Sequence, residues 1–311
     1  MVARFILSLD CEGKWGVADQ LTASAHRQLS DSGLRTGYRN VLSLLDEFEV
    51  PATFAFVGLF AESADGLRRL LPALQPLASL SPEYLAPALA DVERGSRQGW
   101  HGDWAIEQLL ASRTEHELAL HGVTHIPWDA MDRAQAQCEM RLLDAIEAPV
   151  RHARTFVYPR NRVAHAELLS DFGIAGYRKS PPPKSRLASL LAEFDIFARP
   201  EWEEPTGTPQ PIPAGHFVNW QSRTRRIVPI ELSTLRADRM LKEAAAEDGI
   251  VHFWLHPENV VTAPRTLVLL RKIIELVARY REAGHCEVMT QVDYCRSIAS
   301  RATAGKQAEP V

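Results

Sequence analysis

Near the start of this 311-residue chain stands Arg4-Phe-Ile-Leu-Ser-Leu-Asp-Cys-Glu-Gly13, the stretch that most clearly predicts the fold. Its apolar part, Phe5 to Leu9, is a continuous run of the kind found in parallel strands that are covered on both faces. The run leads into two acids, Asp10 and Glu12, on either side of a cysteine. Alternate residues of an extended segment point the same way, so both carboxylates can converge on one point.

Five further apolar runs of the same kind alternate with amphipathic helical patterns. The runs are Thr53 to Val57, Glu117 to Leu120, Thr155 to Tyr158, Ile250 to Leu255 and Cys286 to Met289. The clearest helical patterns cover Tyr38 to Phe48 and Leu267 to Tyr280. Strands that alternate with helices indicate βα units, and the chain length favours a barrel over an open sheet. We therefore predict an α/β fold, a distorted (β/α) barrel of about seven parallel strands.

Two segments and the C-terminal tail break this alternation. Residues 59–114 are rich in Leu, Ala and Pro and predict a helical insertion over one end of the barrel. Residues 180–215 contain Pro181-Pro-Pro183 and several later prolines, which predicts an irregular loop. We expect one domain over residues 1–299 and a small, polar, disordered tail over residues 300–311.

Composition and charge argue against several classes of protein. Apolar residues make up 46% of the chain and charged residues 24%, as in soluble globular proteins. A net charge of -4 without a Lys/Arg cluster argues against nucleic-acid binding. The sequence has neither a transmembrane stretch nor a secretory signal, so we expect a cytoplasmic protein. The four cysteines lack zinc-finger spacing and are expected to be reduced; the oligomeric state is not readable from the sequence.

Two histidine motifs follow predicted strands. His121-Gly-Val-Thr-His125 comes after the run at 117–120, and histidines four apart share one face of a helix, where they can bind one metal ion. The alternative is a structural pair near a helix start. In Trp254-Leu-His256, the histidine follows the run at 250–255 and suits acid or base chemistry, because its ordinary pKa is near neutrality. A single histidine is otherwise more often structural.

Together, these motifs follow the C-terminal ends of strands, which form the active-site face of a βα barrel. Two histidines and one carboxylate make a three-ligand site with an open position, as in catalytic zinc centres. A second carboxylate can serve as general base, and a further histidine can protonate a leaving group. The set is complete for metal-assisted amide hydrolysis.

On these residues the sequence resembles the polysaccharide deacetylases, the NodB-homology or carbohydrate esterase family 4 group, as a divergent member. The similar motifs are Asp10-Cys-Glu12-Gly13, a spaced variant of the family's acidic pair, then His121-Gly-Val-Thr-His125 and Leu255-His256. Residues 50–58, Val-Pro-Ala-Thr-Phe-Ala-Phe-Val-Gly, are similar to the family's second strand. The resemblance spans about residues 3–296.

The resemblance implies a role for each motif residue. Glu12, His121 and His125 would hold a divalent metal, with zinc as the expected ion. Asp10 would take a proton from the attacking water, and His256 would protonate the leaving amine. The implied reaction removes an N-acyl group, acetyl in the first place, from an amino sugar in glycan or surface-polysaccharide biosynthesis. That sugar could be nucleotide-linked, lipid-linked or part of an oligosaccharide.

The family's Arg-x-Pro-x-Gly motif is altered in this chain. The region reads Phe156-Val-Tyr-Pro-Arg-Asn-Arg162, with arginines after the proline and no glycine. Arg160 is the first candidate to orient the catalytic aspartate, followed by Arg162 and Arg154. In the same stretch, the backbone N–H of Tyr158 would help to stabilise a tetrahedral oxyanion.

Two other functions fit part of the pattern. A non-catalytic carbohydrate-binding relative is favoured by the altered arginine motif, but a pure binder needs neither Asp10 nor His256. A non-haem iron oxygenase also uses two histidines and a carboxylate, but the βα pattern argues against it.

Within the insertion, Trp100-His-Gly-Asp-Trp104 fits either a stacking platform for a sugar or a lid anchored by buried tryptophans. A nucleophilic role for Cys11 is disfavoured, because no triad completes it.

Overall fold

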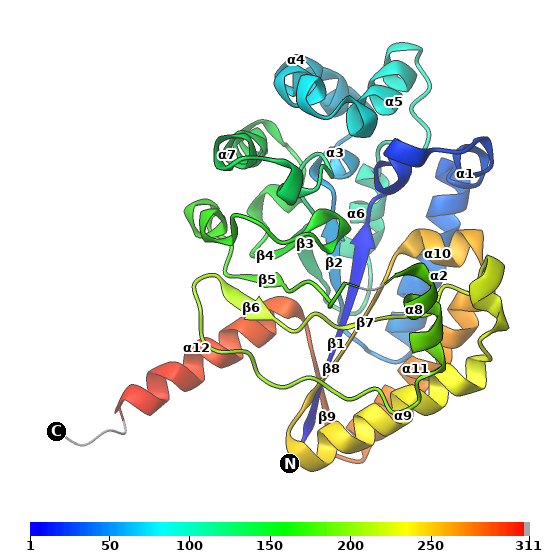
Figure 1. The fold of residues 1–311 in the computed structure, drawn as a ribbon, viewed down its shortest axis with the longest axis vertical. Coiled ribbons are helices and arrows are strands. Elements are labelled where there is room, and N and C mark those ends of the chain that lie inside the picture. The colour runs from blue at the N-terminus through cyan, green and yellow to red at the C-terminus, as the bar shows by residue number, and fades with distance from the viewer. Residues whose placement is uncertain (184, 308–311) are drawn as a thin grey trace.

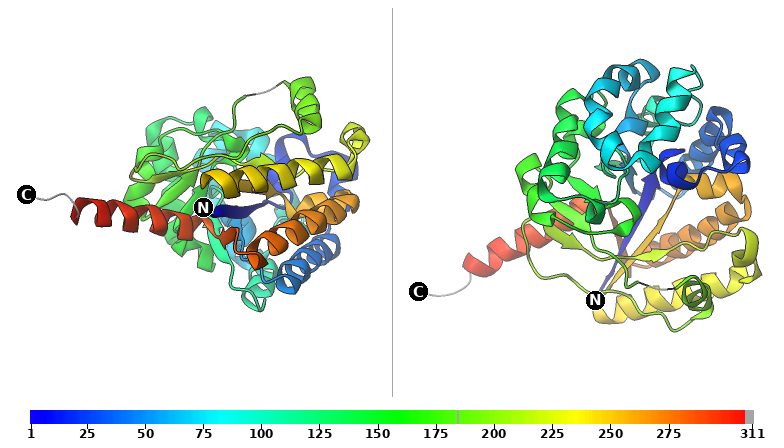
Figure 2. Two further views of the ribbon diagram at one scale, coloured as in Figure 1. Left: turned by 90° about the horizontal axis from the view of Figure 1, so that it is seen from below. Right: turned by 45° about the horizontal axis from the view of Figure 1, so that its top comes forward.

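A curled parallel sheet forms the centre of the computed structural model, which describes residues 1–183 and 185–307 (Figures 1 and 2). Nine strands of these residues form one sheet in the order β6-β5-β4-β3-β2-β1-β8-β7, with β9 also paired to β1. They are β1 (Ala3–Cys11), β2 (Thr53–Phe56), β3 (Glu117–Leu120), β4 (Thr155–Val157), β5 (Gly176–Arg178), β6 (Gln210–Ile212), β7 (His216–Phe217), β8 (Ile250–Leu255) and β9 (Cys286–Met289). The pairings of these strands are parallel, which confirms the distorted (β/α) barrel. The count of about seven was low, because β5, β6 and β7 are too short to show a pattern.

β1 is the central strand, and all of its residues are buried. One edge pairs with β8 over Arg4–Leu9. The other edge pairs with β9 over Ala3–Ile6 and then with β2 over Ser8–Cys11. The acidic end of β1 therefore lies between the C-terminal ends of β2 and β8.

Helices surround the sheet (Figure 1). They are α1 (Ala23–Gln28), α2 (Asp31–Glu47), α3 (Gly58–Ala61), α4 (Ala64–Leu80), α5 (Pro82–Glu93), α6 (Asp103–Leu110), α7 (Arg133–Arg141), α8 (Arg186–Leu191), α9 (Ile230–Glu247), α10 (Pro257–Thr262), α11 (Arg265–Glu282) and α12 (Gln291–Gln307). The helix α2 begins after Ser30, whose hydroxyl accepts a hydrogen bond from Gly33 N at 3.2 Å, and buries a stripe that includes Tyr38 and Leu45. None of the helices in the described residues is both long and apolar enough to cross a bilayer.

The segment 59–114 contains most of α3 and all of α4, α5 and α6, and α4 and α5 lie at the end of the sheet toward which β1 points (Figure 1). Its tryptophans face inward. Trp100 and Trp104 are buried, and the Trp100 carbonyl accepts a hydrogen bond from Trp15 Nε1 at 2.8 Å. Buried indoles cannot stack on a sugar, so these two tryptophans anchor the segment.

Two local expectations are wrong. The segment 180–215 is not wholly irregular: it contains β6 and α8, and α8 begins after Ser185, whose hydroxyl accepts a hydrogen bond from Ala188 N at 3.1 Å. The tail is helical rather than disordered as far as Gln307, because α12 continues through it. Tyr294 and Ile298 fix this helix in a buried cluster with Ile6. The remainder of the predicted tail, 308–311, lies outside the described residues.

Candidate active site

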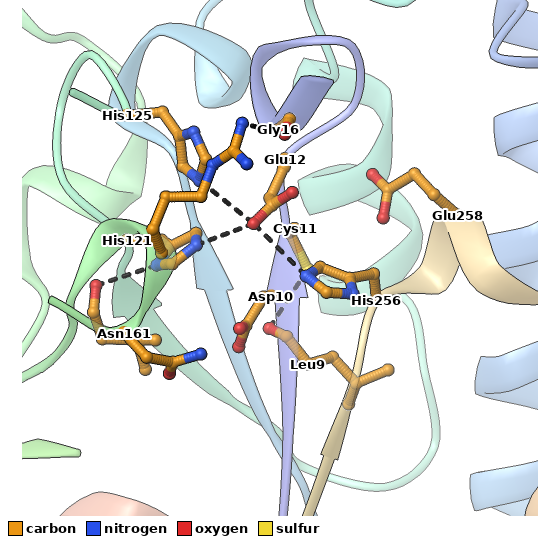
Figure 3. Close-up of polar contacts among 12 residues, drawn as sticks. Leu9, Asp10, Cys11, Glu12, Gly16, His121, His125, Asn161, His256 and Glu258 are labelled. Carbon is orange, nitrogen blue, oxygen red and sulfur yellow. Dashed lines mark hydrogen bonds and ion pairs between the residues drawn. The ribbon is translucent and has the colours of Figure 1, made fainter. Parts of the chain in front are cut away.

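The residues predicted as metal ligands and acid–base pair meet at the C-terminal ends of the strands (Figure 3). Asp10 lies in β1 and Glu12 directly after it, whereas His121 follows β3 and His256 follows β8. Glu12 Oε1 is the meeting point: it lies 2.9 Å from His121 Nε2, 3.1 Å from His125 Nε2 and 3.4 Å from His256 Nε2. Ligand atoms of Asp10, Glu12 and His256 also lie within 4.8 Å of one another, so all five residues form one cluster, although they come from three strands.

The hydrogen-bond partners of His121 are consistent with a metal ligand. Its Nδ1 lies 2.8 Å from the carbonyl oxygen of Val157, which can only accept, so Nδ1 carries the proton. In the neutral ring, Nε2 then presents a lone pair to Glu12 Oε1, and two acceptors would face each other at 2.9 Å. A proton or a metal ion between them removes this repulsion. A backbone carbonyl behind a ring nitrogen is also the usual way to orient a metal-binding histidine.

The surroundings of His125 and Glu12 are consistent with metal ligands. Burial lowers the pKa of His125, which favours the neutral ring that binds metals. Burial raises the pKa of Glu12, but the nearby His256 and His125 outweigh it and hold the pKa well below its ordinary value. The ligand atoms of Glu12, His121 and His125 all lie within 4.8 Å of one another. Two nitrogens and one carboxylate oxygen are a donor set that zinc accepts.

The two histidines do not share a helix, contrary to the expectation from their spacing. Residues 121–127 form an irregular turn in which Gly122 has φ +69° and His125 has φ +64°. A Cβ on residue 122 would lie 2.8 Å from Pro159 Cγ, so only glycine fits. The left-handed backbone at His125 is unfavourable for a non-glycine residue and needs support from its surroundings.

Glu139, on α7, supplies that support and was not singled out from the sequence. Its buried carboxylate accepts hydrogen bonds from Val123 N, Thr124 N and Thr124 Oγ1 at 2.9 Å each, and from Trp128 Nε1 at 2.6 Å. These donors are the backbone and side chains of the turn between the two histidines and of the residues that follow. A single acid in a predicted amphipathic helix carries no signal of this role.

We predict that Glu139→Ala loosens the metal site as well as the fold. The change leaves four buried donors without an acceptor, and each unsatisfied group costs about 1–3 kcal/mol, so the total loss should exceed about 3 kcal/mol. Urea unfolding gives the stability, and zinc titration of the folded variant gives the metal affinity. Glu167→Ala is the control, because Glu167 makes an exposed pair with Arg133. Equal stabilities of the two variants would contradict this role of Glu139.

Asp10 is oriented by Arg178, at the end of β5. Arg178 Nη1 donates to Asp10 Oδ1 at 2.8 Å and Nη2 donates to Oδ2 at 2.6 Å, a two-pronged contact in which both side chains are buried. Burial raises the pKa of Asp10, but Arg178 together with His121 and His256 outweighs it, so the pKa lies below its ordinary value. Asp10 therefore remains ionised, as a general base must.

Arg160 does not have the orienting role that we expected. Its guanidinium donates to the carbonyl of Gly16 and to Asp19, both away from Asp10. The backbone explains the difference: Arg160 and Asn161 both have left-handed φ values, +58° and +54°, which turn the chain after Pro159. Arg162, the second candidate, lies 3.5 Å from Asp129.

Arg178 is itself held by several groups that the sequence did not reveal. Nη1 also donates to Ser8 Oγ at 3.0 Å, Nη2 donates to Asn161 Oδ1 at 2.8 Å, and the guanidinium lies 4.7 Å from the centre of the Trp254 ring. Behind Ser8 stands His252, whose Nε2 is 2.9 Å from the hydroxyl. Burial lowers the pKa of His252 to about 3, so its ring is neutral and adds no charge beside the arginine.

We predict that Arg178→Lys is much more destabilising than Arg160→Lys. Lysine keeps the charge but cannot form the planar fork, so at least one buried hydrogen bond to a carboxylate is lost, at about 1.5–3 kcal/mol. The Arg160–Asp19 pair is partly exposed, with 28% and 23% of the two side chains accessible, and such pairs contribute about 1 kcal/mol or less. Urea denaturation of both variants makes the comparison. A larger loss for Arg160→Lys would show that the wrong arginine has been assigned.

His256 faces the cluster from the opposite side. Its Nδ1 lies 3.2 Å from Asn259 Oδ1, which leaves Nε2 toward Glu12. Burial lowers the pKa of His256, but the negative charges of Glu12 and Asp10 outweigh it and raise the pKa to about 10. Burial and the charge of Glu12 raise the pKa of the neighbouring Glu258 to about 7, and Glu258 Oε1 accepts a hydrogen bond from Gly13 N at 2.5 Å. His256 is thus a protonated group in the absence of a metal cation.

A cleft gives access to this cluster. A cavity of about 540 Å³ is lined by Asp10, Glu12, His121 and His256, together with Phe217, Trp220 and Trp254.

Cys11 is buried and burial raises the pKa of its thiol well above the ordinary value, which argues against a nucleophilic cysteine. Tyr158 is also buried, and its peptide N–H belongs to the same peptide group as the Val157 carbonyl that contacts His121. Its role in stabilising an oxyanion stays a prediction.

Comparison with known proteins gives a result at the level of structure only. No protein-family model and no curated protein matches the sequence. Among solved structures, a protein described as a polysaccharide deacetylase from Mycobacterium smegmatis aligns with a TM-score of 0.62 and 16% identity, over 97% of this chain and 91% of its own. One from Pseudomonas aeruginosa PAO1 aligns with a TM-score of 0.58 and 13% identity, over 94% and 90%. The chain has the polysaccharide deacetylase fold.

The same fold also occurs in an enzyme of another name. The PuuE allantoinase aligns with a TM-score of 0.53 and 17% identity, over 94% of this chain and 89% of its own. The deacetylase fold is therefore compatible with more than one substrate. The activity of this chain has to be argued from its own site.

Proposed function

We propose that this protein is a metal-dependent hydrolase that removes an N-acyl group, acetyl in the first place, from an amino sugar. The observation that carries the proposal is the single cluster in which Glu12 Oε1 meets the Nε2 atoms of His121, His125 and His256. Asp10, fixed by Arg178, stands beside it. A second acid and a third histidine are what amide hydrolysis requires beyond metal binding.

Each residue then has one task. Glu12, His121 and His125 would hold the ion, which when bound would polarise the acyl carbonyl and make water more acidic. Asp10 accepts the proton of the attacking water, because Arg178 keeps it ionised. His256 donates a proton from Nε2 to the amide nitrogen as the C–N bond breaks, so that the amine leaves neutral. Zinc is our proposed ion, because the ligand set is two imidazoles and one carboxylate.

Two considerations favour the hydrolase over the competing functions. A non-catalytic binder was favoured only by the altered arginine motif, and Arg178 supplies the missing contact to Asp10 from another strand. An iron oxygenase needs no buried base held by an arginine and no opposing histidine. We assign the hydrolase to glycan or surface-polysaccharide biosynthesis on the basis of the family resemblance.

Acetate release tests the proposed function. We expect the zinc-loaded protein to release acetate from at least one member of a panel of N-acetylated sugars, namely free N-acetylglucosamine, UDP-N-acetylglucosamine and chitin oligosaccharides. Each acetate should be matched by one free amine. The Asp10→Asn variant provides the background. Binding of panel members without acetate or amine would instead favour the non-catalytic relative.

A further inference from the structure

A second cavity lies beside the candidate active site and is not used by the proposed hydrolysis. Its volume is about 670 Å³, and it shares part of its wall with the first cavity. The shared residues are Arg160, Asn161, Phe217, Trp254 and His256. Four arginines line it, and we call it the arginine lobe after them: Arg160, Arg162, Arg225 and Arg236.

Two of the four arginines in the lobe share one acid. Arg225 and Arg236 share one buried carboxylate, that of Glu193, at 2.6 and 3.0 Å. Asp195 also lies in the wall, and the other two arginines pair with acids outside it, Arg160 with Asp19 and Arg162 with Asp129. Arg236 is almost wholly buried, and its Nε has no partner in the described part of the chain. Two guanidinium groups for one carboxylate leave room for a second anion.

The lobe also lies within reach of the candidate active site. The guanidinium of Arg225 lies 5.6 Å from the centre of the Phe217 ring, and that ring lies 6.0 Å from the ring of His256. Ser189 Oγ accepts a hydrogen bond from Arg225 Nη2 at 2.7 Å and fixes the orientation of the guanidinium. The Phe217 ring therefore separates His256, the proposed proton donor, from the oriented guanidinium of Arg225. One sugar and its substituent can span this distance.

We propose that the arginine lobe binds the phosphate group of a phosphate-linked amino sugar while the acyl group of that sugar lies against the Glu12–histidine cluster. The inference rests on the proposed function and narrows its substrate class. A guanidinium presents paired N–H donors that match phosphate oxygens, and burial makes such contacts strong. A neutral oligosaccharide would leave Arg225 and Arg236 with one shared carboxylate, that of Glu193.

Such a phosphate could belong to a nucleotide or to a lipid carrier. The segment that forms one wall of the lobe, α8 and the residues after it, exposes large apolar side chains on its outer face. Leu187 is 66% exposed, Leu191 60% and Phe194 41%. An apolar rim next to a phosphate subsite is a reason to test a lipid-linked sugar alongside a nucleotide-linked one.

Isothermal titration calorimetry in chelator-containing buffer tests the lobe without turnover. The probes are N-acetylglucosamine, UDP-N-acetylglucosamine and N-acetylglucosamine linked through diphosphate to a ten-carbon prenyl chain. We expect at least one phosphate-bearing probe to bind roughly ten- to hundredfold more tightly than the free sugar, and Arg225→Gln to remove most of that gain, the size of one hydrogen bond to a charged group. Arg226→Gln is the matched control, because Arg226 is exposed and is not among the residues that line the lobe.

The outcomes separate the alternatives. Equal affinity of free and phosphate-linked sugars, or an equal loss in Arg226→Gln and Arg225→Gln, would overturn the proposal. If Arg225→Gln fails to fold, Arg162→Gln replaces it, because the Arg162 side chain is 55% exposed and lines the same lobe. A loss of affinity in Leu187→Ser for the prenyl probe alone would identify a lipid carrier. Phosphate-dependent binding without any acetate release would keep the subsite and reject the proposed hydrolysis.

Discussion

Asp10→Asn should lower kcat by roughly 10²–10⁴-fold and leave the metal content unchanged, because it removes the general base and none of the three proposed ligands. Asparagine has a similar shape but no proton affinity in this range. The reaction should therefore proceed only as fast as unassisted attack by water allows. The measurement is the initial rate of acetate release, with metal content determined on the same sample.

A loss of stability has to be separated from this loss of activity. Asp10→Asn leaves the buried guanidinium of Arg178 without its counter-charge, so the variant should also unfold at lower urea concentration. The rate is therefore measured where the variant is fully folded. Asp19→Asn is the matched control, since it neutralises another aspartate paired with an arginine, that of Arg160. A kcat for Asp10→Asn within about twofold of that control would reject Asp10 as the base.

The His121→Ala, His125→Ala double variant should retain almost no metal ion after dialysis against metal-free buffer. Glu12 would be the single remaining ligand of the proposed three, and one carboxylate binds zinc poorly in competition with water. Glu12→Gln should have a milder effect, with weaker binding and partial recovery of activity at high zinc concentration. Elemental analysis of the dialysed proteins gives the metal content.

A histidine outside the cluster is the control for this loss. His26 lies in α1 with its side chain 41% exposed, and His26→Ala should leave the metal content at the wild-type level. Stoichiometric metal in the double variant would place the metal site elsewhere. Loss of the metal in Asp10→Asn together with its retention in Glu12→Gln would instead reverse the roles of the two acids.

Long patterns and close spacings explain which parts of the fold were predictable. The runs at 117–120, 250–255 and 286–289 became β3, β8 and β9 with unchanged bounds, because each is a mostly apolar run that stops at a polar residue, His121, His256 or Thr290. The three-residue strand β5 is too short to show such a pattern. The sequence therefore did not predict this strand, or the role of Arg178 at its end. The tail was taken as disordered because it is small and polar, but the buried side chains of Tyr294 and Ile298 fix the helix that it extends.

The candidate site likewise has a part that could be predicted from the sequence and a part that could not. Its five central residues were recognisable because they belong to motifs that end or directly follow a strand, and the ends of parallel strands meet. The groups that orient them were not: Arg178 contacts Asp10 across 168 residues of sequence, and Glu139 reaches the histidine turn from α7. We expected the orienting arginine next to Pro159, but the left-handed backbone at residues 160 and 161 turns the Arg160 side chain toward Asp19. Such contacts depend on tertiary structure and leave no local pattern.

The most direct test of the central claim, that this cluster is the metal centre of an N-acyl hydrolase, is reconstitution of acetate release by metal. The protein is stripped with a chelator and dialysed, and zinc is then titrated back while acetate release is followed on the best substrate of the panel. We predict no release from the stripped protein and a linear return that reaches its plateau at one zinc ion per chain. Acetate release that survives complete removal of the metal would contradict the account.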